Sequence, residues 1–226
     1  MVGPMKLLAI DTASERCSVG IAADDRPAVL LSETLGRGHA ERLFGMIASA
    51  MTEAGLGFAE LDRIAVTVGP GSFTGVRVGI AAARGLALVL GCPVAGIGTL
   101  DVAAEAARAQ AGAVPVLAVI DARRDEVYAQ AFDRDGRPLS APAAGPAGIL
   151  SAWLTPGMVL AGSGAHLAAA IPAGSGLRIV HHDSAADIAA LVRLGLAAPV
   201  PAGAPRPLYL RAPDAKPQAA AAVPRR

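Results

Sequence analysis

The sequence predicts an α/β protein built from two similar lobes. In the first half, apolar runs of strand length alternate with longer segments of helical periodicity, in the order β-β-β-α-β-α-β-α. This order begins again about 110 residues later, where the apolar run Val116–Asp121 matches the run Leu7–Asp11 and again ends on an aspartate. The alternation and the repeat together predict a first lobe over residues 1–112 and a second, smaller lobe over residues 113–211.

The first lobe begins with three strands joined by short turns, which predicts an antiparallel meander. The helix that follows has apolar residues on more than one narrow stripe, so part of it is expected to face something other than its own sheet. Thr99 is expected to cap the last helix of the lobe. The predicted elements are strands at 6–11, 17–23, 28–34, 64–68 and 93–98, and helices at 39–54, 75–90 and 99–110.

The second lobe is predicted with less regular elements. Its strands are expected at 116–121, 126–132, 157–161 and 177–180, and its helices at 146–154, up to residue 170 and at 185–196. From Ala197 onwards alanine and proline dominate, and residues 212–226 are predicted to be a disordered tail.

Composition and charge restrict the function. The net charge of +1 provides no global field that would draw the chain onto nucleic acid, so direct RNA binding is disfavoured. Cys17 and Cys92 follow no disulfide or zinc pattern and suit a reducing compartment. The longest apolar run is interrupted by Arg84, is shorter than the roughly 20 residues of a membrane span, and no signal peptide precedes it. We therefore expect a cytoplasmic protein without a membrane partner.

A glycine-rich stretch, Val68–Gly79, joins a buried strand to an apolar helix. The free N–H groups at the start of that helix are able to hold an anion. No Gly-Lys-Ser/Thr follows, however, so this is not a Walker A loop, and Ser72 or Thr74 can cap the helix without a ligand. Close packing of another helix is better supported, because small residues recur every four positions along one face. They are Gly75, Gly79, Ala83 and Ala87.

The aspartates that close the first strand of each lobe, Asp11 and Asp121, fit the architecture of actin, Hsp70 and sugar kinases. This actin-like ATPase architecture has two ribonuclease-H-like lobes, each a mixed five-stranded sheet with helices. In its ATPases the two aspartates hold Mg²⁺ across a cleft and neighbouring glycines admit the phosphates. Neither turn has a glycine here, so we expect a relic cleft. The alternative is an autonomous nucleotide hydrolase or kinase. Its candidate nucleotide-binding residues are Asp11, Thr12, Asp121, Gly162 and Gly164.

Four segments resemble the TsaB (YeaZ) family, a bacterial subunit of the machinery that makes tRNA threonylcarbamoyladenosine (t6A). They are Leu8–Thr12, Gly69–Gly79, Ile120–Tyr128 and Tyr209–Arg211. The resemblance covers residues 6–211 in the right order. It implies a non-catalytic subunit that docks and activates TsaD, the enzyme that moves threonylcarbamoyl onto N6 of adenosine 37. It also implies a TsaE-like ATPase partner, a homodimer in isolation, indirect or weak contact with tRNA, and ATP or ADP at the complex interface as the only candidate cofactor.

Docking is expected on the two apolar helices at 39–54 and 75–90. Two helices of roughly 24 Å can supply the buried area of about 800 Å² per partner that stable interfaces have. The predicted partner-binding residues are Leu43, Phe44, Ile47, Met51, Gly75, Arg77, Gly79 and Ala83.

No metal site is expected. TsaD carries a His-x-x-x-His pair whose positions correspond to Thr99 and Ala103 in this chain, and neither residue can bind a metal. The histidines His39, His166 and His181 have no partners at metal-ligand spacing. With no nucleophile elbow either, a peptidase is disfavoured.

Overall fold

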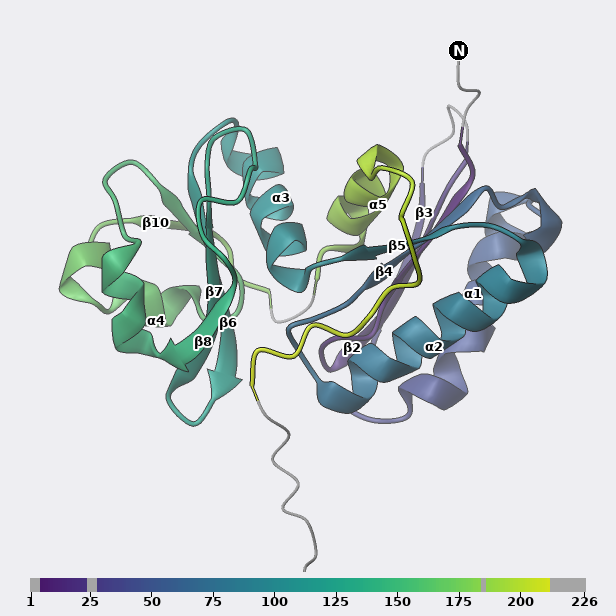
Figure 1. Cartoon of the computed structure of the whole chain (residues 1–226), viewed down its shortest axis with the longest axis horizontal. Helices are drawn as coiled ribbons and strands as arrows, with labels where there is room; N and C mark the ends of the chain where they lie inside the picture. Colours follow the sequence, from purple (N-terminus) through teal and green to yellow (C-terminus); the bar gives the residue numbers. More distant parts are fainter. Residues whose placement is uncertain (1–4, 24–27, 184–185, 212–226) are drawn as a thin grey trace, which may run out of the picture.

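The computed structural model describes residues 5–23, 28–183 and 186–211, and it confirms the predicted two-lobed α/β fold (Figure 1). Each lobe contains one five-stranded mixed sheet, in the order β3-β2-β1-β4-β5 or β10-β9-β6-β7-β8. The central strands β1 (Leu7–Asp11) and β6 (Val116–Arg123) each pair antiparallel on one side and parallel on the other. The internal repeat is therefore a structural repeat.

The remaining strands of the first sheet are β2 (Arg16–Ala22), β3 (Val29–Thr34), β4 (Arg63–Thr67) and β5 (Val94–Ile97). The second sheet adds β7 (Glu126–Phe132), β8 (Ala143–Pro146), β9 (Val159–Ala161) and β10 (Arg178–His181). The helices are α1 (His39–Ala54), α2 (Phe73–Leu90), α3 (Thr99–Ala111), α4 (Ala165–Ala169) and α5 (Ile188–Ala197). Short 3₁₀ helices lie at Phe58–Glu60, Ala147–Ala152 and Pro172–Gly174.

Three local predictions differ from the structure. The edge strand β8 was not predicted, because Ala-Ala-Gly-Pro has no β-branched or aromatic residue to mark it. The helix expected at 146–154 is a short 3₁₀ turn. Gly98, and not Thr99, occupies the N-cap of α3, so Thr99 is its first helical residue.

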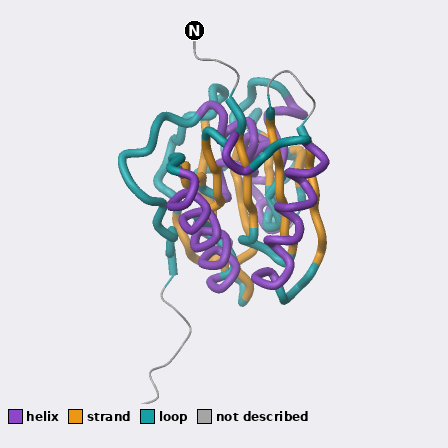
Figure 2. The backbone as a smooth tube through the Cα atoms, turned by 90° about the vertical axis from the view of Figure 1, so that its right-hand side faces the viewer, coloured by secondary structure: helices purple, strands orange, loops and turns teal. Residues whose placement is uncertain are grey.

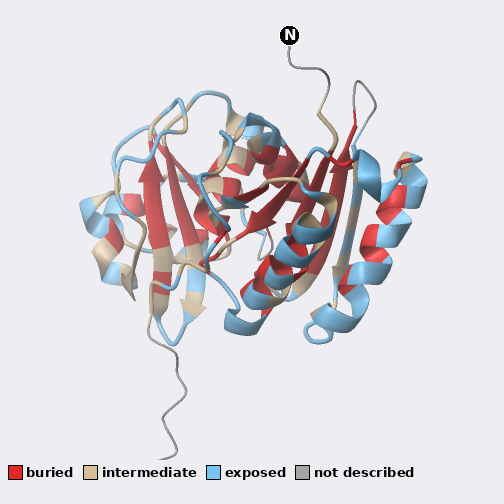
Figure 3. Ribbon diagram, turned by 45° about the vertical axis from the view of Figure 1, so that its right-hand side comes forward, coloured by how far each residue is buried: buried red, intermediate tan, exposed pale blue. Residues whose placement is uncertain are grey.

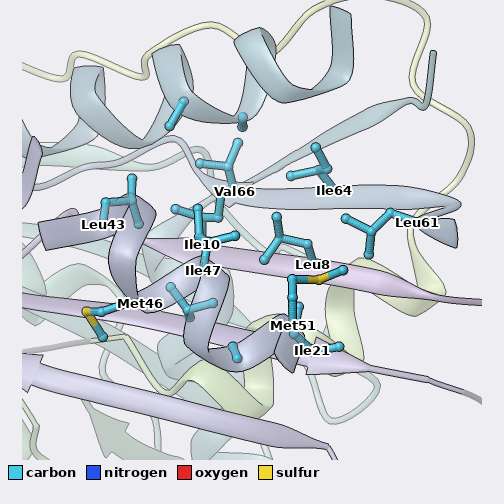
Figure 4. Packing of buried hydrophobic residues seen from close by; sticks show 14 of the residues in the cluster. Leu8, Ile10, Ile21, Leu43, Met46, Ile47, Met51, Leu61, Ile64 and Val66 are labelled. Atoms are coloured by element: carbon cyan, nitrogen blue, oxygen red, sulfur yellow. The ribbon is translucent and has the colours of Figure 1, made fainter. Parts of the chain in front are cut away.

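Helices α1 and α2 cover one face of the first sheet, which is turned towards the viewer in Figure 2. Their inward side chains join those of β1, β2 and β4 in one apolar core (Figure 4). The residues of the two helices alternate between buried and exposed along their length (Figure 3), as expected for helices with one side on a sheet.

Helices α3 and α5 cover the opposite face. Helix α3 lies between the two sheets: Val102 and Ala106 pack towards the first lobe, whereas Leu100 and Ala103 pack against the strands of the second. Helix α5 packs on β1, β2 and β4, although its sequence position assigned it to the second lobe.

The chain stays with the first lobe after α5. The buried guanidinium of Arg63 donates to the carbonyls of Gly195 and Ala198, at 2.9 and 2.6 Å, and so satisfies the end of α5. Further on, the N–H of Leu208 donates to the carbonyl of Val68 at 2.8 Å. Helix α5 and Leu208 thus contact the first lobe. The boundary between a first lobe at 1–112 and a second at 113–211 stays a prediction. The predicted disordered tail, 212–226, lies outside the described residues.

Helix α2 packs closely against Thr12, the residue that follows β1. A Cβ at Gly75 would overlap the carbonyl oxygen of Thr12, and one at Gly79 would lie 2.5 Å from the Thr12 hydroxyl. The helix runs from Phe73, earlier than expected, and its length and composition would also suit a membrane span. The cytoplasmic location and the lack of a membrane partner stay predictions.

A matched pair of glycine substitutions tests this packing. Gly75→Ala forces a methyl group onto the Thr12 backbone and should lower the free energy of unfolding by more than about 2 kcal/mol. A Cβ at Gly85, in the same helix, meets nothing within 4 Å, so Gly85→Ala should raise it by about 0.5–1 kcal/mol. Urea denaturation of both variants measures the difference; equal effects would contradict the proposed contact.

Candidate functional site

Two regions contain the residues singled out by the sequence: the cleft between the lobes and the outer face of α1 and α2. The cleft has a volume of about 430 Å³ and lies where β1 and β6 end. It is lined by the turn after β1, the start of α2, the end of β6 and its hairpin, and Ser163.

Asp11 does not face this cleft. Its side chain is fully buried, and its Oδ1 accepts hydrogen bonds from the Thr67 hydroxyl at 2.6 Å and the Ala13 N–H at 3.1 Å. Burial raises the pKa of Asp11 above its ordinary value, with the hydrogen bond from Thr67 opposing that rise. A carboxyl group in this position joins β1 to β4, and it is not available to a cation in the cleft.

Asp121 is exposed and lines the cleft, so only one member of the predicted pair reaches it. Its Oδ1 accepts from the N–H of Arg123 at 2.7 Å, inside the hairpin between β6 and β7. In this hairpin Arg123, Arg124 and Asp125 all have positive φ angles, of 63°, 56° and 60°. Left-handed backbone costs non-glycine residues roughly 1 kcal/mol or more each, so this hairpin is strained.

The other predicted nucleotide-binding residues have structural roles. The Thr12 hydroxyl is buried and donates to the Gly75 carbonyl at 2.7 Å. Gly162 has φ +92°, and a Cβ there would overlap the carbonyl of Val119. A Cβ at Gly164 would lie 2.8 Å from the Val119 side chain. Packing against β6 thus accounts for both glycines without a ligand.

Backbone N–H groups at the start of α2 form hydrogen bonds within the chain. Ser72 caps the helix, because its hydroxyl accepts from the Gly75 N–H at 3.2 Å, and its own N–H donates to the Ala13 carbonyl at 2.7 Å. The preceding Gly69–Pro70 peptide bond is cis. The glycine-rich stretch therefore allows close packing against the turn after β1, whereas the sequence led us to expect close packing of another helix.

The residues predicted to bind a partner divide into two groups. Only Phe44 and Arg77 are exposed. The others lie in the core of the first lobe or against β1: Leu43, Ile47, Met51, Gly75, Gly79 and Ala83. The ridge of small residues therefore contacts the sheet of its own lobe. A charged side chain at Gly79 or Ala83 would disrupt the fold before it tested docking.

Different residues of the same helices form the outer face. On α2, Leu88 and Val89 are 86% and 83% exposed, and on α1 Phe44 is 55% exposed. Besides charged residues such as Glu41 and Arg84, the same helices expose small ones: Gly45, Ala48, Ser49 and Thr52 on α1, and Ala81 and Gly85 on α2. We call this set the outer helix face.

An aromatic–arginine cluster at the start of α2 was missed by sequence reasoning. The Arg77 guanidinium lies 3.7 Å from the centre of the Phe73 ring, and its Nε donates to the Tyr209 hydroxyl at 2.7 Å. The two rings are 5.1 Å apart. The motif Tyr209–Arg211 was the available signal, but nothing in it identifies a contact across 132 residues.

Metal binding finds no support among the described residues, where no three His, Cys, Asp or Glu side chains gather. Thr99 and Ala103 are both buried. Burial raises the pKa of the Cys17 thiol to about 11, which disfavours its reactive thiolate form.

Comparison with known proteins gives a consistent result. Residues 31–167 match the family described as TsaD: tRNA N6-adenosine threonylcarbamoyltransferase. The tRNA threonylcarbamoyladenosine biosynthesis protein TsaB of Escherichia coli K12 is 43% identical over 131 residues, which are 58% of this chain and 56% of that protein. The chain thus spans about half the length of this curated relative.

Two further relatives match over most of their length. An uncharacterised protein of Mycobacterium bovis is 37% identical over 216 residues, covering 94% of this chain and 95% of that protein. Among solved structures, YeaZ from Pseudomonas aeruginosa is 34% identical with a TM-score of 0.72, covering 84% of this chain and 90% of that one.

The environment of Asp11 gives a pH-dependent prediction. A folded-state pKa above the ordinary value means that the protonated form stabilises the fold at low pH, and that this contribution is lost as the pH rises through the raised pKa. Asp11→Asn removes the ionisation. The free energy of unfolding of the variant should therefore increase relative to that of the wild type as the pH rises from acidic to neutral.

Urea denaturation across this range measures the difference between the two proteins. Asp135→Asn, at an exposed turn position, is the control and should show no such trend. A difference that is independent of pH would contradict the assignment.

Proposed function

Because this chain belongs to the TsaB (YeaZ) family, we propose that it is a non-catalytic subunit in tRNA threonylcarbamoyladenosine biosynthesis that docks and activates a TsaD-type threonylcarbamoyltransferase. The observation that carries the proposal is the outer helix face. It exposes Leu88, Val89 and Phe44 on two neighbouring helices that pack on one sheet. Exposed large apolar side chains that gather on one surface mark interaction sites.

The glycines of this face support the same interpretation. Gly45 and Gly85 lie inside helices, where glycine is about 1 kcal/mol less favourable than alanine. The fold does not require them, since a Cβ at Gly85 meets nothing and one at Gly45 makes only an ordinary contact of 3.5 Å. Small exposed residues allow another helix to approach closely, which gives these positions a use in a complex.

The dimensions also suit a stable complex. With 16 and 18 residues, α1 and α2 are roughly 24 and 27 Å long. Two helices of that length can bury the approximately 800 Å² per partner of a standard interface. The partner would contact outward residues of these helices, and the buried residues first predicted would hold the helices in place.

The alternative, an autonomous nucleotide hydrolase or kinase, is less well supported. It needs two carboxylates in the cleft, and Asp11 is buried beside Thr67. Isothermal titration with Mg·ATP separates the two functions, because micromolar binding that is lost in Asp11→Asn would favour the enzyme.

The remaining partners follow from the family resemblance alone. They are a TsaE-like ATPase, a second copy of the chain in isolation, tRNA through indirect or weak contact, and ATP or ADP at the interface of the complex. Location in the cytoplasm belongs with them, since t6A formation acts on tRNA.

Two substitutions on the outer helix face test docking. Ala48→Glu would place an unpaired charge in the interface, and Leu88→Ala removes an exposed apolar side chain. Each should change the free energy of unfolding by no more than about 0.5 kcal/mol, as surface substitutions do. Each should weaken binding to a purified TsaD-type subunit about tenfold or more and lower t6A formation in a reconstituted reaction.

The second lobe offers matched controls. Ala152→Glu makes the same charge change at an exposed position, and Leu139→Ala removes another exposed leucine. Both controls should bind like the wild type. If Ala48→Glu and Leu88→Ala also bound at wild-type affinity, docking through this face would be refuted.

A further inference from the structure

The C-terminal segment 198–211, here called the strap, runs beside α2 and ends near the second lobe (Figure 1). Besides the bond from Leu208 to Val68, it places Pro205 against Gly96, where an added Cβ would lie 3.0 Å from the proline ring. At its end the Arg211 guanidinium lies 3.1 Å from the Glu126 carboxylate of β7. The strap is thus fixed along its length, and it adds a second wall to the surface of α2.

Two hollows lie between α2 and the strap. The larger, of about 540 Å³, is mostly apolar, with Gly85 and Leu88 on one side and Pro201 and Pro205 on the other. The smaller, of about 360 Å³, has Ile80 and Ala81 as its apolar lining and Pro207 as its strap wall. Arg84 lines both hollows, and Arg77 lines the smaller one.

The two arginines have no neutralising partner in the described part of the chain. Neither Arg77 nor Arg84 makes an ion pair with a described carboxylate, in contrast to Arg42, Arg193 and Arg211. Neither α2 nor the strap contains any Asp or Glu. This surface therefore presents positive charge and apolar hollows together.

Arg77 is also held in position. Phe73 and Tyr209 stack with its guanidinium, and the hydroxyl of Tyr209 accepts from its Nε, which leaves its terminal N–H groups for another ligand. An arginine already fixed by neighbouring rings loses less conformational entropy when it binds. Arginine and tyrosine, moreover, are the residue types that most often dominate binding energy at interfaces.

We infer that α2 and the strap together form a binding surface for an acidic, amphipathic segment of a partner protein, with carboxylates at Arg77 and Arg84 and an apolar side chain in the larger hollow. The inference rests on the proposed function, because the TsaD-type subunit is the partner that would carry this segment. It extends the docking site from the helix pair to the strap.

The chemistry of the surface favours this occupant over two others. Nucleic acid would pair with the arginines but would leave Leu88 and the apolar hollow uncovered. A second copy paired surface to surface would bring the same arginines against one another, which is repulsive.

Charge reversal at Arg84 tests the inference. The side chain is exposed and makes no ion pair with a described carboxylate, so Arg84→Glu should fold normally. The affinity of Arg84→Glu for the purified TsaD-type subunit should fall about tenfold or more, and the affinity of Arg84→Gln should fall less. Raising NaCl from about 50 to 500 mM should weaken binding of the wild type more than that of Arg84→Glu, because an ion pair has been removed.

Arg134→Glu is the control, as an exposed arginine in a turn of the second lobe, and should bind like the wild type. Filter binding of a tRNA transcript and sedimentation velocity of the chain alone complete the experiment. Wild-type affinity of Arg84→Glu for the TsaD-type subunit would overturn the inference and leave the proposed function standing. If Arg84→Glu lost only tRNA binding, the inference would be overturned in favour of nucleic acid as the occupant. If it lost only self-association, a second copy of the chain would be the occupant instead. If the wild-type chain did not bind the TsaD-type subunit, both the inference and the proposed function would fall.

Discussion

The contact between the end of β1 and the start of α2 is the constraint on which the rest of the structure depends. The two segments are joined by two hydrogen bonds: the Ala13 carbonyl accepts from the Ser72 N–H, and the Gly75 carbonyl accepts from the Thr12 hydroxyl. Such an approach leaves no room for a Cβ at Gly71 or Gly75. It fixes the direction of α2, and with it the surface that the helix presents outward.

The same contact explains why the cleft differs from a nucleotide site. The N–H groups that could receive a phosphate at the start of α2 are partly used by Ser72 and Ala13. Asp11 turns inward to Thr67, and the strained hairpin after Asp121 brings Arg123 into the cleft. The fold is that of the actin-like ATPases, and large apolar side chains are exposed on its helices, at Phe44 on α1 and at Leu88 and Val89 on α2.

Periodicity and the internal repeat were enough to predict the two sheets and most helices, because those signals are local. Two kinds of feature escaped. The first is the direction of a side chain at the end of a strand, as at Asp11. A shift of the strand by one residue would turn that side chain to the other face of the sheet. Contacts across long separations, such as the return of α5 to the first sheet or the 132 residues between Arg77 and Tyr209, leave no local pattern. Docking through α1 and α2 stays a prediction, and most of the residues predicted for it face inward.

Glycine in α2 shows why that choice could not be made from sequence. Gly75 and Gly79 face β1, where the fold excludes any larger residue, whereas Gly85 faces open space beside the strap. All three are glycines within one apolar helix, although only Gly75 and Gly79 belong to the four-residue spacing of small residues. Only at Gly75 and Gly79 does the fold of the chain itself require glycine. Gly85 lowers helix stability by about 1 kcal/mol without a compensating contact among the described residues, which is why it supports the proposal of a partner that approaches α2 at that point.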